Sequence, residues 1–173
     1  MSAKWYTEQP SNRNFLNPIG FLLKLEKFNG VDFFCQTANV PDISMSTTEV
    51  ATPFRNLPII PSGGVSFGDL VVRFIVDEDL KNYYSIHQWI RDNGNADQMQ
   101  RTTEEDDIYT NGQLHIVTSQ YNPAFIVEFN NLFPVSLSNM QFDATMTDAE
   151  YITAEVVFKH QQFFIRDTNL QPL

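Results

Sequence analysis

Leu70-Val71-Val72-Arg73-Phe74-Ile75-Val76 runs directly into Asp77-Glu78-Asp79, and this stretch decides the fold class of the chain. Its first seven residues are mostly β-branched or aromatic, which is typical of a β-strand. The acidic residues predict the N-cap and first turn of a helix at about 79–92, because carboxylates are favoured at helix N-termini. One face of the predicted helix comprises Leu80, Tyr83, Tyr84, Ile86, His87, Trp89 and Ile90, and Gly94 is the expected stop.

Further strands are predicted on both sides of this helix. Upstream, residues 21–28 and residues 31–36 flank Asn29-Gly30, the strongest short-range signal for a β-hairpin. Downstream, strands are expected at 114–118, 124–129, 132–137 and 151–166, with Ile152, Ala154, Val156 and Phe158 sharing one face of the last. The pattern predicts a mainly β fold, an antiparallel β-sandwich or barrel with one flanking α-helix.

Residues 42–64 form a separate feature, a long extended arm or hairpin. Their prolines are spaced in a way that is hostile to a central strand. The segment is also too apolar for a solvated loop, so it needs apolar partners. It could pack over its own core or, if it is exposed, mark an interface. The residues that we predict to make a subunit interface are Met45, Val50, Pro53, Phe54, Leu57, Ile59 and Ile60.

Two polar segments complete the predicted organisation. Residues 1–20 lack periodicity and predict an irregular N-terminal arm, either loose or docked on a neighbouring molecule. Residues 95–112 contain Glu104-Glu105-Asp106-Asp107 and predict an acidic surface loop. At 173 residues, the chain 1–173 fits a single domain. No stretch has the apolar core of a signal peptide or the ~20 apolar residues of a membrane span, so we expect no membrane anchor.

The sequence offers little that would support catalysis. The net charge of -10 disfavours a protein that grips DNA, because duplex binding depends on cationic side chains. The single cysteine, Cys35, excludes an intramolecular disulfide. The three histidines, His87, His115 and His160, lack metal-binding spacing and are interpreted as structural. Ser62-Gly63-Gly64 lacks the ending of a phosphate-binding loop. We therefore expect no metal, no cofactor and no enzymatic activity.

Several motifs, taken in order, resemble one known family. They are residues 34–41 with their Ala38-x-x-Pro41 break, Phe54-Arg55-Asn56, the strand-to-helix stretch 66–79, Trp89, Leu132-Phe133-Pro134-Val135 and the closing run 151–164. Together these residues resemble the tail tube proteins of contractile-tailed bacteriophages (myoviruses), over about residues 15–165. Each motif is weak alone, and their order and spacing carry the resemblance.

The resemblance implies how the protein assembles and where it acts. Members of the family form hexameric rings whose inner strands join into one barrel, and the long arm stacks the rings into a tube. The implied partners are other copies of the chain, a tail sheath, and baseplate or terminator proteins. DNA would pass through the lumen without specific binding. The implied location is the virion tail, after synthesis in the host cytoplasm.

Some alternatives remain open at this point. A baseplate protein that initiates the tube, or the tube protein of a bacterial contractile secretion system, would share the fold. A small-ligand-binding β-barrel belongs to a different class. Acids such as Glu128 or Glu155 could give the lumen a negative wall that keeps DNA centred. Alternatively, the acids serve solubility or meet a basic sheath protein.

Overall fold

The computed structural model describes residues 16, 18–27, 34–60, 64–94, 108–118, 120, 122–145 and 151–172. The body contains the helix α2 (Lys81–Gly94) and seven strands. The body strands are β1 (Phe21–Leu25), β2 (Cys35–Ala38), β7 (Leu70–Ile75), β8 (Thr110–Val117), β9 (Pro123–Leu137), β10 (Thr153–Lys159) and β11 (Gln162–Asp167). Four short strands form a projecting arm: β3 (Ile43–Met45), β4 (Thr48–Ala51), β5 (Asn56–Ile59) and β6 (Val65–Phe67).

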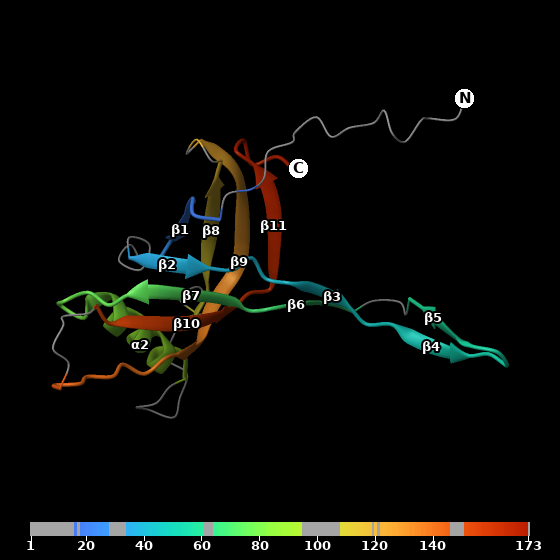
Figure 1. Cartoon of the computed structure of the whole chain (residues 1–173), viewed down its shortest axis with the longest axis horizontal. Coiled ribbons are helices and arrows are strands. Elements are labelled where there is room, and N and C mark those ends of the chain that lie inside the picture. Colours follow the sequence, from blue (N-terminus) through green and yellow to red (C-terminus); the bar gives the residue numbers. More distant parts are fainter. Residues whose placement is uncertain are drawn as a thin grey trace.

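The body strands pair in the order β1-β8-β9-β10-β7-β2, with β11 added on β9. Every pairing is antiparallel. In Figure 1, β1, β8 and β11 run across the direction of β2, β7 and β10. The two ends of the strand order, β1 and β2, come into contact, so the sheet curls round on itself. Among the described residues, the predicted antiparallel sandwich or barrel with one flanking helix is confirmed.

A single long strand, β9, joins the two sets of strands. Its first part pairs with β8 and β11, and its last part, from Phe133 to Leu137, pairs with β10. Asn131, at the change of partners, has a φ of 53°, which an asparagine tolerates better than most residues. The sequence predicted two strands here, at 124–129 and 132–137. They form one strand because the chain changes partners without leaving the sheet.

The predicted hairpin around Asn29-Gly30 is wrong in its pairing. β1 pairs with β8 and β2 pairs with β7, so the two strands lie at opposite ends of the strand order. Asn29-Gly30 itself lies outside the described residues. The turn signal is local, whereas the partner of each strand is set by which face of the sheet its apolar residues bury.

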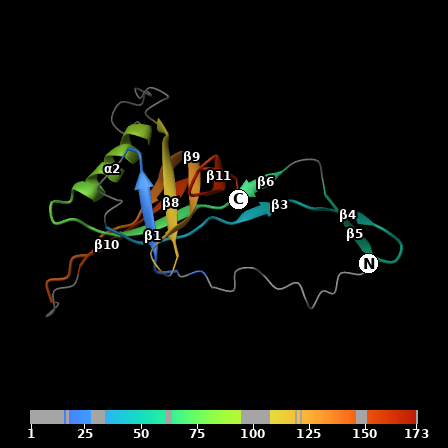
Figure 2. The same cartoon turned by 90° about the horizontal axis from the view of Figure 1, so that it is seen from above.

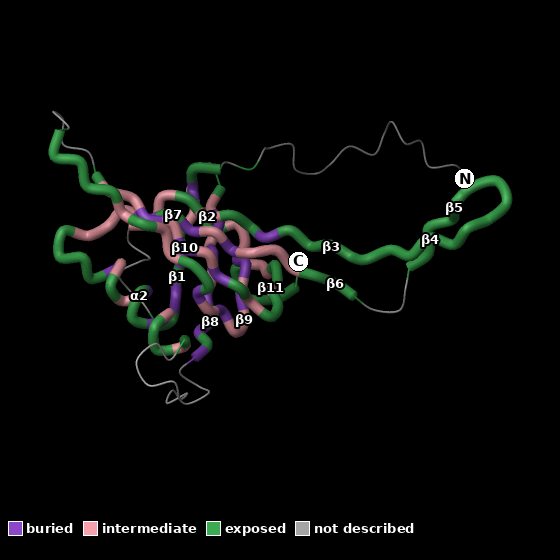
Figure 3. The backbone as a smooth tube through the Cα atoms, turned by 90° about the horizontal axis from the view of Figure 1, so that it is seen from below, coloured by how far each residue is buried: buried purple, intermediate pink, exposed green. Residues whose placement is uncertain are grey.

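The core fills the space inside the curled sheet. Its largest fully buried side chains are those of Phe74, Phe129 and Phe158, which come from three different strands. α2 closes one side, where Trp89 packs 6.2 Å from Phe158 between ring centroids and donates its indole N–H to the Ile108 carbonyl. The predicted shared face of β10 is confirmed, since Ala154, Val156 and Phe158 are buried; Figure 3 shows burial concentrated in this body.

The helix begins later than predicted, and its buried face is rotated. α2 starts at Lys81, so Asp77-Glu78-Asp79 precede it and do not form its first turn. The buried side chain of Asn82 ties the start down instead, accepting from Asp77 N–H at 3.1 Å and donating to the Ile75 carbonyl at 2.9 Å. The buried positions are Asn82, Ile86 and Trp89, while the predicted face residues Leu80, Tyr84 and His87 are exposed.

Three other boundaries also differ from prediction. The run 151–166 divides into β10 and β11 at His160-Gln161, because the chain turns there to pair with a different part of β9. β8 begins at Thr110 and includes the end of the predicted loop 95–112, whose acidic part lies outside the described residues. Most of the predicted N-terminal arm also lies outside them. No helix in the described part of the chain is long and apolar enough to cross a membrane.

Candidate interaction surface

The arm is a narrow two-stranded ribbon that projects from one end of the body (Figures 1 and 2). β3 pairs with β6 nearer the body, and β4 pairs with β5 towards the tip. Thr52 N–H donates to the Arg55 carbonyl at 3.2 Å and closes the turn at the tip. Two prolines fit the ribbon, because Pro53 lies in the turn and Pro58 lies on a strand that has only one partner among the described strands.

All seven residues predicted as a subunit interface lie on this ribbon, in or beside its strands, and all are exposed. Phe54, at the tip, is 99% exposed, and Ile60 is 72% exposed. Val50 and Leu57 are cross-strand partners, so they present one shared apolar surface. The possibility that the arm packs over its own core is therefore excluded, and the green arm of Figure 3 makes this visible. A ribbon with this much apolar surface in water is typical of an interaction site.

Hydrogen bonds made by the Asn39 side chain and by the backbone fix the root of the arm. The side chain of Asn39 donates to the Asp69 carbonyl at 3.0 Å and accepts from Val71 N–H at 2.6 Å, which joins the two chain segments that enter and leave the arm. Gly68 N–H donates to the Asp42 carbonyl at 2.9 Å. A Cβ at Gly68 would displace the Asp42 carboxylate and lie 3.3 Å from the Asp42 backbone nitrogen, so glycine favours this close approach of the two segments.

An aromatic cluster supports the same root. Phe67, the last residue of β6, packs edge-on against Phe163 with ring centroids 5.5 Å apart, and lies 5.9 Å from the ring of His160. Phe129 completes the cluster at 5.3 Å from His160. Burial lowers the pKa of His160, while the Gly68 backbone and the Asp69 carboxylate act against that shift. Asp69 in turn forms an ion pair with Lys159, with Asp69 Oδ1 and Lys159 Nζ 3.8 Å apart.

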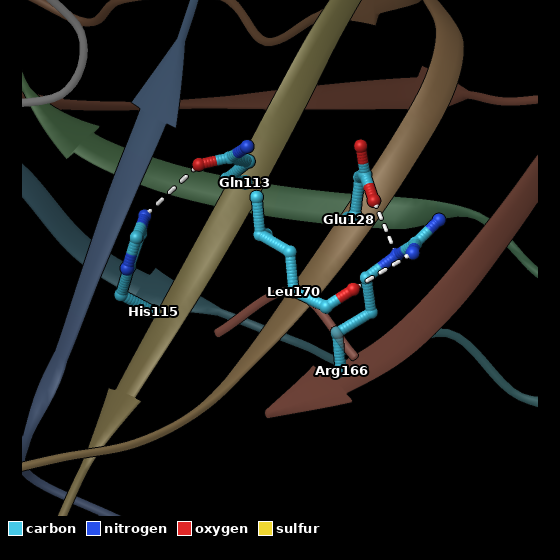
Figure 4. A network of polar contacts seen from close by, with 5 residues as sticks. All are labelled: Gln113, His115, Glu128, Arg166 and Leu170. Carbon is cyan, nitrogen blue, oxygen red and sulfur yellow. Dashed lines mark hydrogen bonds and ion pairs between the residues drawn. The ribbon is translucent and has the colours of Figure 1, made fainter. Parts of the chain in front are cut away.

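The outer face of β8, β9 and β11 carries a small polar network (Figure 4). Arg166 Nε lies 2.6 Å from Glu128 Oε2, and Arg166 also donates to the Leu170 carbonyl at 3.0 Å. On β8, His115 and Gln113 are hydrogen bonded at 3.2 Å. Burial, followed by the charge of Lys24, lowers the pKa of His115. The side chains hold each other in place and converge on no common point for a substrate.

A second exposed apolar region was missed by the sequence reasoning. Phe142 is 79% exposed and Tyr151 is 67% exposed, on the connection between β9 and β10. Ser138 anchors the start of this connection by hydrogen bonds to both the N–H and the carbonyl of Glu155. Phe142 is a lone aromatic residue in a polar stretch without strand periodicity. That signal could have identified it as a surface contact.

The candidate metal-binding and catalytic side chains do not come together in the described residues. They contain no group of three or more metal-binding side chains. The histidines His87, His115 and His160 lie on α2, on β8 and at the β10–β11 turn, so they do not converge. Cys35 is half-buried, and its thiol donates to the Thr37 carbonyl with the sulfur and oxygen 3.6 Å apart. Of the predicted glycine turn, only Gly64 is described, and its φ of 124° fits a turn.

Comparison with known proteins gives a consistent result. The family described as phage tail tube protein matches residues 8–166. No curated protein matches the chain in sequence. Similar solved structures include a chain of the tube-terminating cap of the anti-feeding prophage, with 17% identity, a TM-score of 0.66, and coverage of 96% of this chain and 100% of that one.

Two further structures have the same architecture. A chain of the anti-feeding prophage baseplate has 14% identity and a TM-score of 0.63, with coverage of 94% of this chain and 99% of that one. A chain of the sheath–tube complex of the extracellular contractile injection system PVC has 16% identity and a TM-score of 0.62, with coverage of 90% and 94%. At these identities the similarity shows a shared fold.

Proposed function

The chain belongs to the phage tail tube protein family, and from this premise we propose that it is the building block of a tail tube, assembled as stacked six-membered rings. The tube is a channel for DNA. The observation that carries the proposal is the free-standing arm, whose tip residue Phe54 is 99% exposed. An arm of this kind is unfavourable for an isolated molecule in water, and contact with other copies of the chain removes that cost.

A second feature of the body supports ring formation. β11 pairs with β9 alone among the described strands, and its outer edge meets a further residue only where Arg166 bridges to Pro172. Among the described residues no second strand covers that edge, which favours its pairing with a neighbouring subunit. Natural proteins seldom leave such an edge uncovered, because unpaired strand edges recruit other strands.

The packed interior favours a structural role over small-ligand binding. Barrels that hold a ligand leave room inside, whereas here Phe74, Phe129 and Phe158 fill the space with no exposure to solvent. The members of this family serve as tube and cap components and not as enzymes. We propose the same for this chain, which would act without a cofactor.

The place of the chain within the tail has two further candidates. The similarity to a baseplate chain and to a tube-terminating cap chain favours a protein that starts or ends a tube as an alternative to the repeated subunit. A tube that delivers a protein cargo, as part of a contractile injection system, is the other alternative. In each case the partners are copies of the chain, a sheath, and baseplate or terminator proteins, and the location is a tail structure, proposed here as that of a virion.

Charge supports a channel through which DNA slides. An excess of ten negative charges in each subunit repels a polyanion, so DNA passes without being held. Glu128 and Glu155 contribute little to such a wall, because each lies beside an arginine of a neighbouring strand. The acids that give the lumen its net charge would then be others of the 21 in the chain.

Electron microscopy of the purified protein tests the proposal. Negatively stained samples at increasing protein concentration are expected to contain rings with six-fold symmetry or tubes of constant width. Light scattering on the same samples is expected to give a mass that grows with concentration. A monodisperse monomer at the highest concentration would contradict assembly, and rings with a different symmetry would contradict the six-membered ring.

A further inference from the structure

The arm and the segment 138–145, two exposed parts of the described chain, lie at opposite ends of its long axis. The arm projects at one end, and the segment 138–145 projects at the other, in both views of the molecule (Figures 1 and 2). Each segment carries an exposed phenylalanine, Phe54 at 99% and Phe142 at 79%. Neither ring is covered within the subunit, so each needs a partner from outside it.

The tip of the arm and the opposite end of the molecule carry charges of opposite sign. Arg55 is the only charged residue of the tip turn, residues 52–55, and Glu49, the one acid among residues 43–60, accepts from Asn56 Nδ2 at 2.9 Å. Asp143, beside Phe142, accepts hydrogen bonds from the N–H and the hydroxyl of Thr145, which stabilise its ionised form and hold its position. The β7–α2 turn, which contains Asp77 and Glu78, lies at the same end of the molecule as the segment 138–145. An arm tip with one cation thus matches an acidic end.

Hydrogen bonds anchor the start of the segment 138–145 to the body, so the segment can serve as a docking surface. Ser138 bonds to both backbone groups of Glu155, and its carbonyl accepts from the Tyr83 hydroxyl at 3.1 Å. The segment is therefore tied to β10 and to α2. A contact there loses less conformational entropy than one on an unanchored loop.

We propose that the arm tip of one subunit docks on the segment 138–145 of another copy of the chain, with Phe54 against Phe142 and Arg55 against Asp143. The contact joins two different surfaces of one chain, so it is heterologous and repeats from copy to copy, as a ring or an open stack requires. This inference rests on the proposed function, since only an assembling subunit brings the two ends together.

Cysteine cross-linking in assembled full-length protein tests the contact. In a Cys35→Ser background, Phe54→Cys combined with Phe142→Cys is oxidised with copper phenanthroline and run on a non-reducing gel. We expect a ladder of dimers and higher multimers. The matched control pairs Ile60→Cys, which is exposed on the same arm but away from the tip, with Phe142→Cys, and gives no ladder.

Charge reversal provides an independent test that needs no cysteine. Arg55→Asp alone and Asp143→Arg alone should each raise the protein concentration needed for assembly about three-fold, as expected for an exposed ion pair. The combined variant should return it close to the wild-type value. If the double-cysteine variant fails to assemble, the contact is tested by whether the combined charge-reversed variant assembles at the wild-type protein concentration.

The possible failures can be told apart. Normal tubes that give no 54–142 ladder, or a combined charge variant no better than the single ones, would overturn this contact and leave the tube function standing. Wild-type protein that forms neither rings nor tubes would overturn the function itself, and the contact with it.

Discussion

Arg166 Nε and Glu128 Oε2 lie 2.6 Å apart on the neighbouring strands β11 and β9, and both side chains are shielded from most of the solvent. The guanidinium also lies 5.4 Å from the centre of the Phe164 ring and reaches the Leu170 carbonyl. The pair thus joins the end of β11 and the C-terminal turn to the middle of the sheet.

Breaking this pair should lower the free energy of unfolding. Glu128→Gln and Arg166→Gln are each expected to cost about 1 kcal/mol, because each leaves a partly shielded charge without its partner. The double variant should cost less than the sum of the two, with a coupling energy of about 1 kcal/mol. Urea unfolding of the wild-type protein, the two single variants and the double variant measures the coupling energy. Strict additivity would show that the pair contributes nothing.

Asn82 should be more important for folding than its position on a helix suggests. Asn82→Ala removes an acceptor for Asp77 N–H and a donor for the Ile75 carbonyl, both partly buried. We expect a loss of about 2 kcal/mol in the free energy of unfolding, as for other unsatisfied buried groups. Ser85→Ala, one helical turn on, is the control and should cost far less. Thermal unfolding by circular dichroism compares the two variants.

Two phenylalanine variants should separate assembly from folding. Phe54→Ala is expected to leave the melting temperature unchanged and to raise the concentration needed for assembly about 30-fold, the size of an interface hot spot. Phe158→Ala, in the core, should instead destabilise the fold by about 3–5 kcal/mol. Sedimentation velocity measures assembly, and thermal unfolding measures the stability of the fold. Normal assembly of the Phe54 variant would show that the arm tip is not a contact.

Acid should weaken the root of the arm through His160. Because burial lowers its pKa in the folded protein, the unfolded chain binds the proton at higher pH. The free energy of unfolding therefore falls as pH decreases through about 6.5, and the loss ends below the folded pKa. We expect His160→Phe to reduce the drop in melting temperature by about 2 °C between pH 7.5 and 5.5. Phe67→Leu keeps the histidine and should keep the full drop.

The assembled protein should not hold duplex DNA. Fluorescence anisotropy of a labelled duplex, titrated with tubes at moderate salt, is expected to show no change, because the subunit carries a net charge of -10. Binding in the micromolar range that weakens with added salt would contradict this expectation. It would also indicate a ring of cations facing the channel.

The sequence predicted the elements better than their partners. The strand at 70–76, the helix after it and the exposed arm all carry strong local signals, namely β-branched runs, helical spacing and prolines among apolar residues. The pairing of β1 was predicted wrongly, because Asn29-Gly30 describes only a turn, while Leu23 and Leu25 are buried against β8 and the core. Two strands that pair across such a long stretch of sequence leave no local signal of their pairing.

The surface sites were predictable to a similar extent. The seven arm residues are exposed, as the predicted interface requires, and their role in an interface stays a prediction. Phe142 was missed because a single aromatic residue in a polar stretch is a weak signal. The start of α2 was also missed, because the buried Asn82 replaces the usual acidic cap with bonds to residues in the preceding turn and strand.

The pairing of β1 with β8 also determines when the protein can fold during its synthesis. Leu25 lies opposite Gly112, so the first strand must wait until that later part of the chain has left the ribosome. The arm is complete well before then, yet the curled sheet and its core are not. In the assembly proposed here, a growing chain would carry its arm before it has a complete body to receive another arm. The late partner of β1 would thus delay polymerisation until β8 has been made.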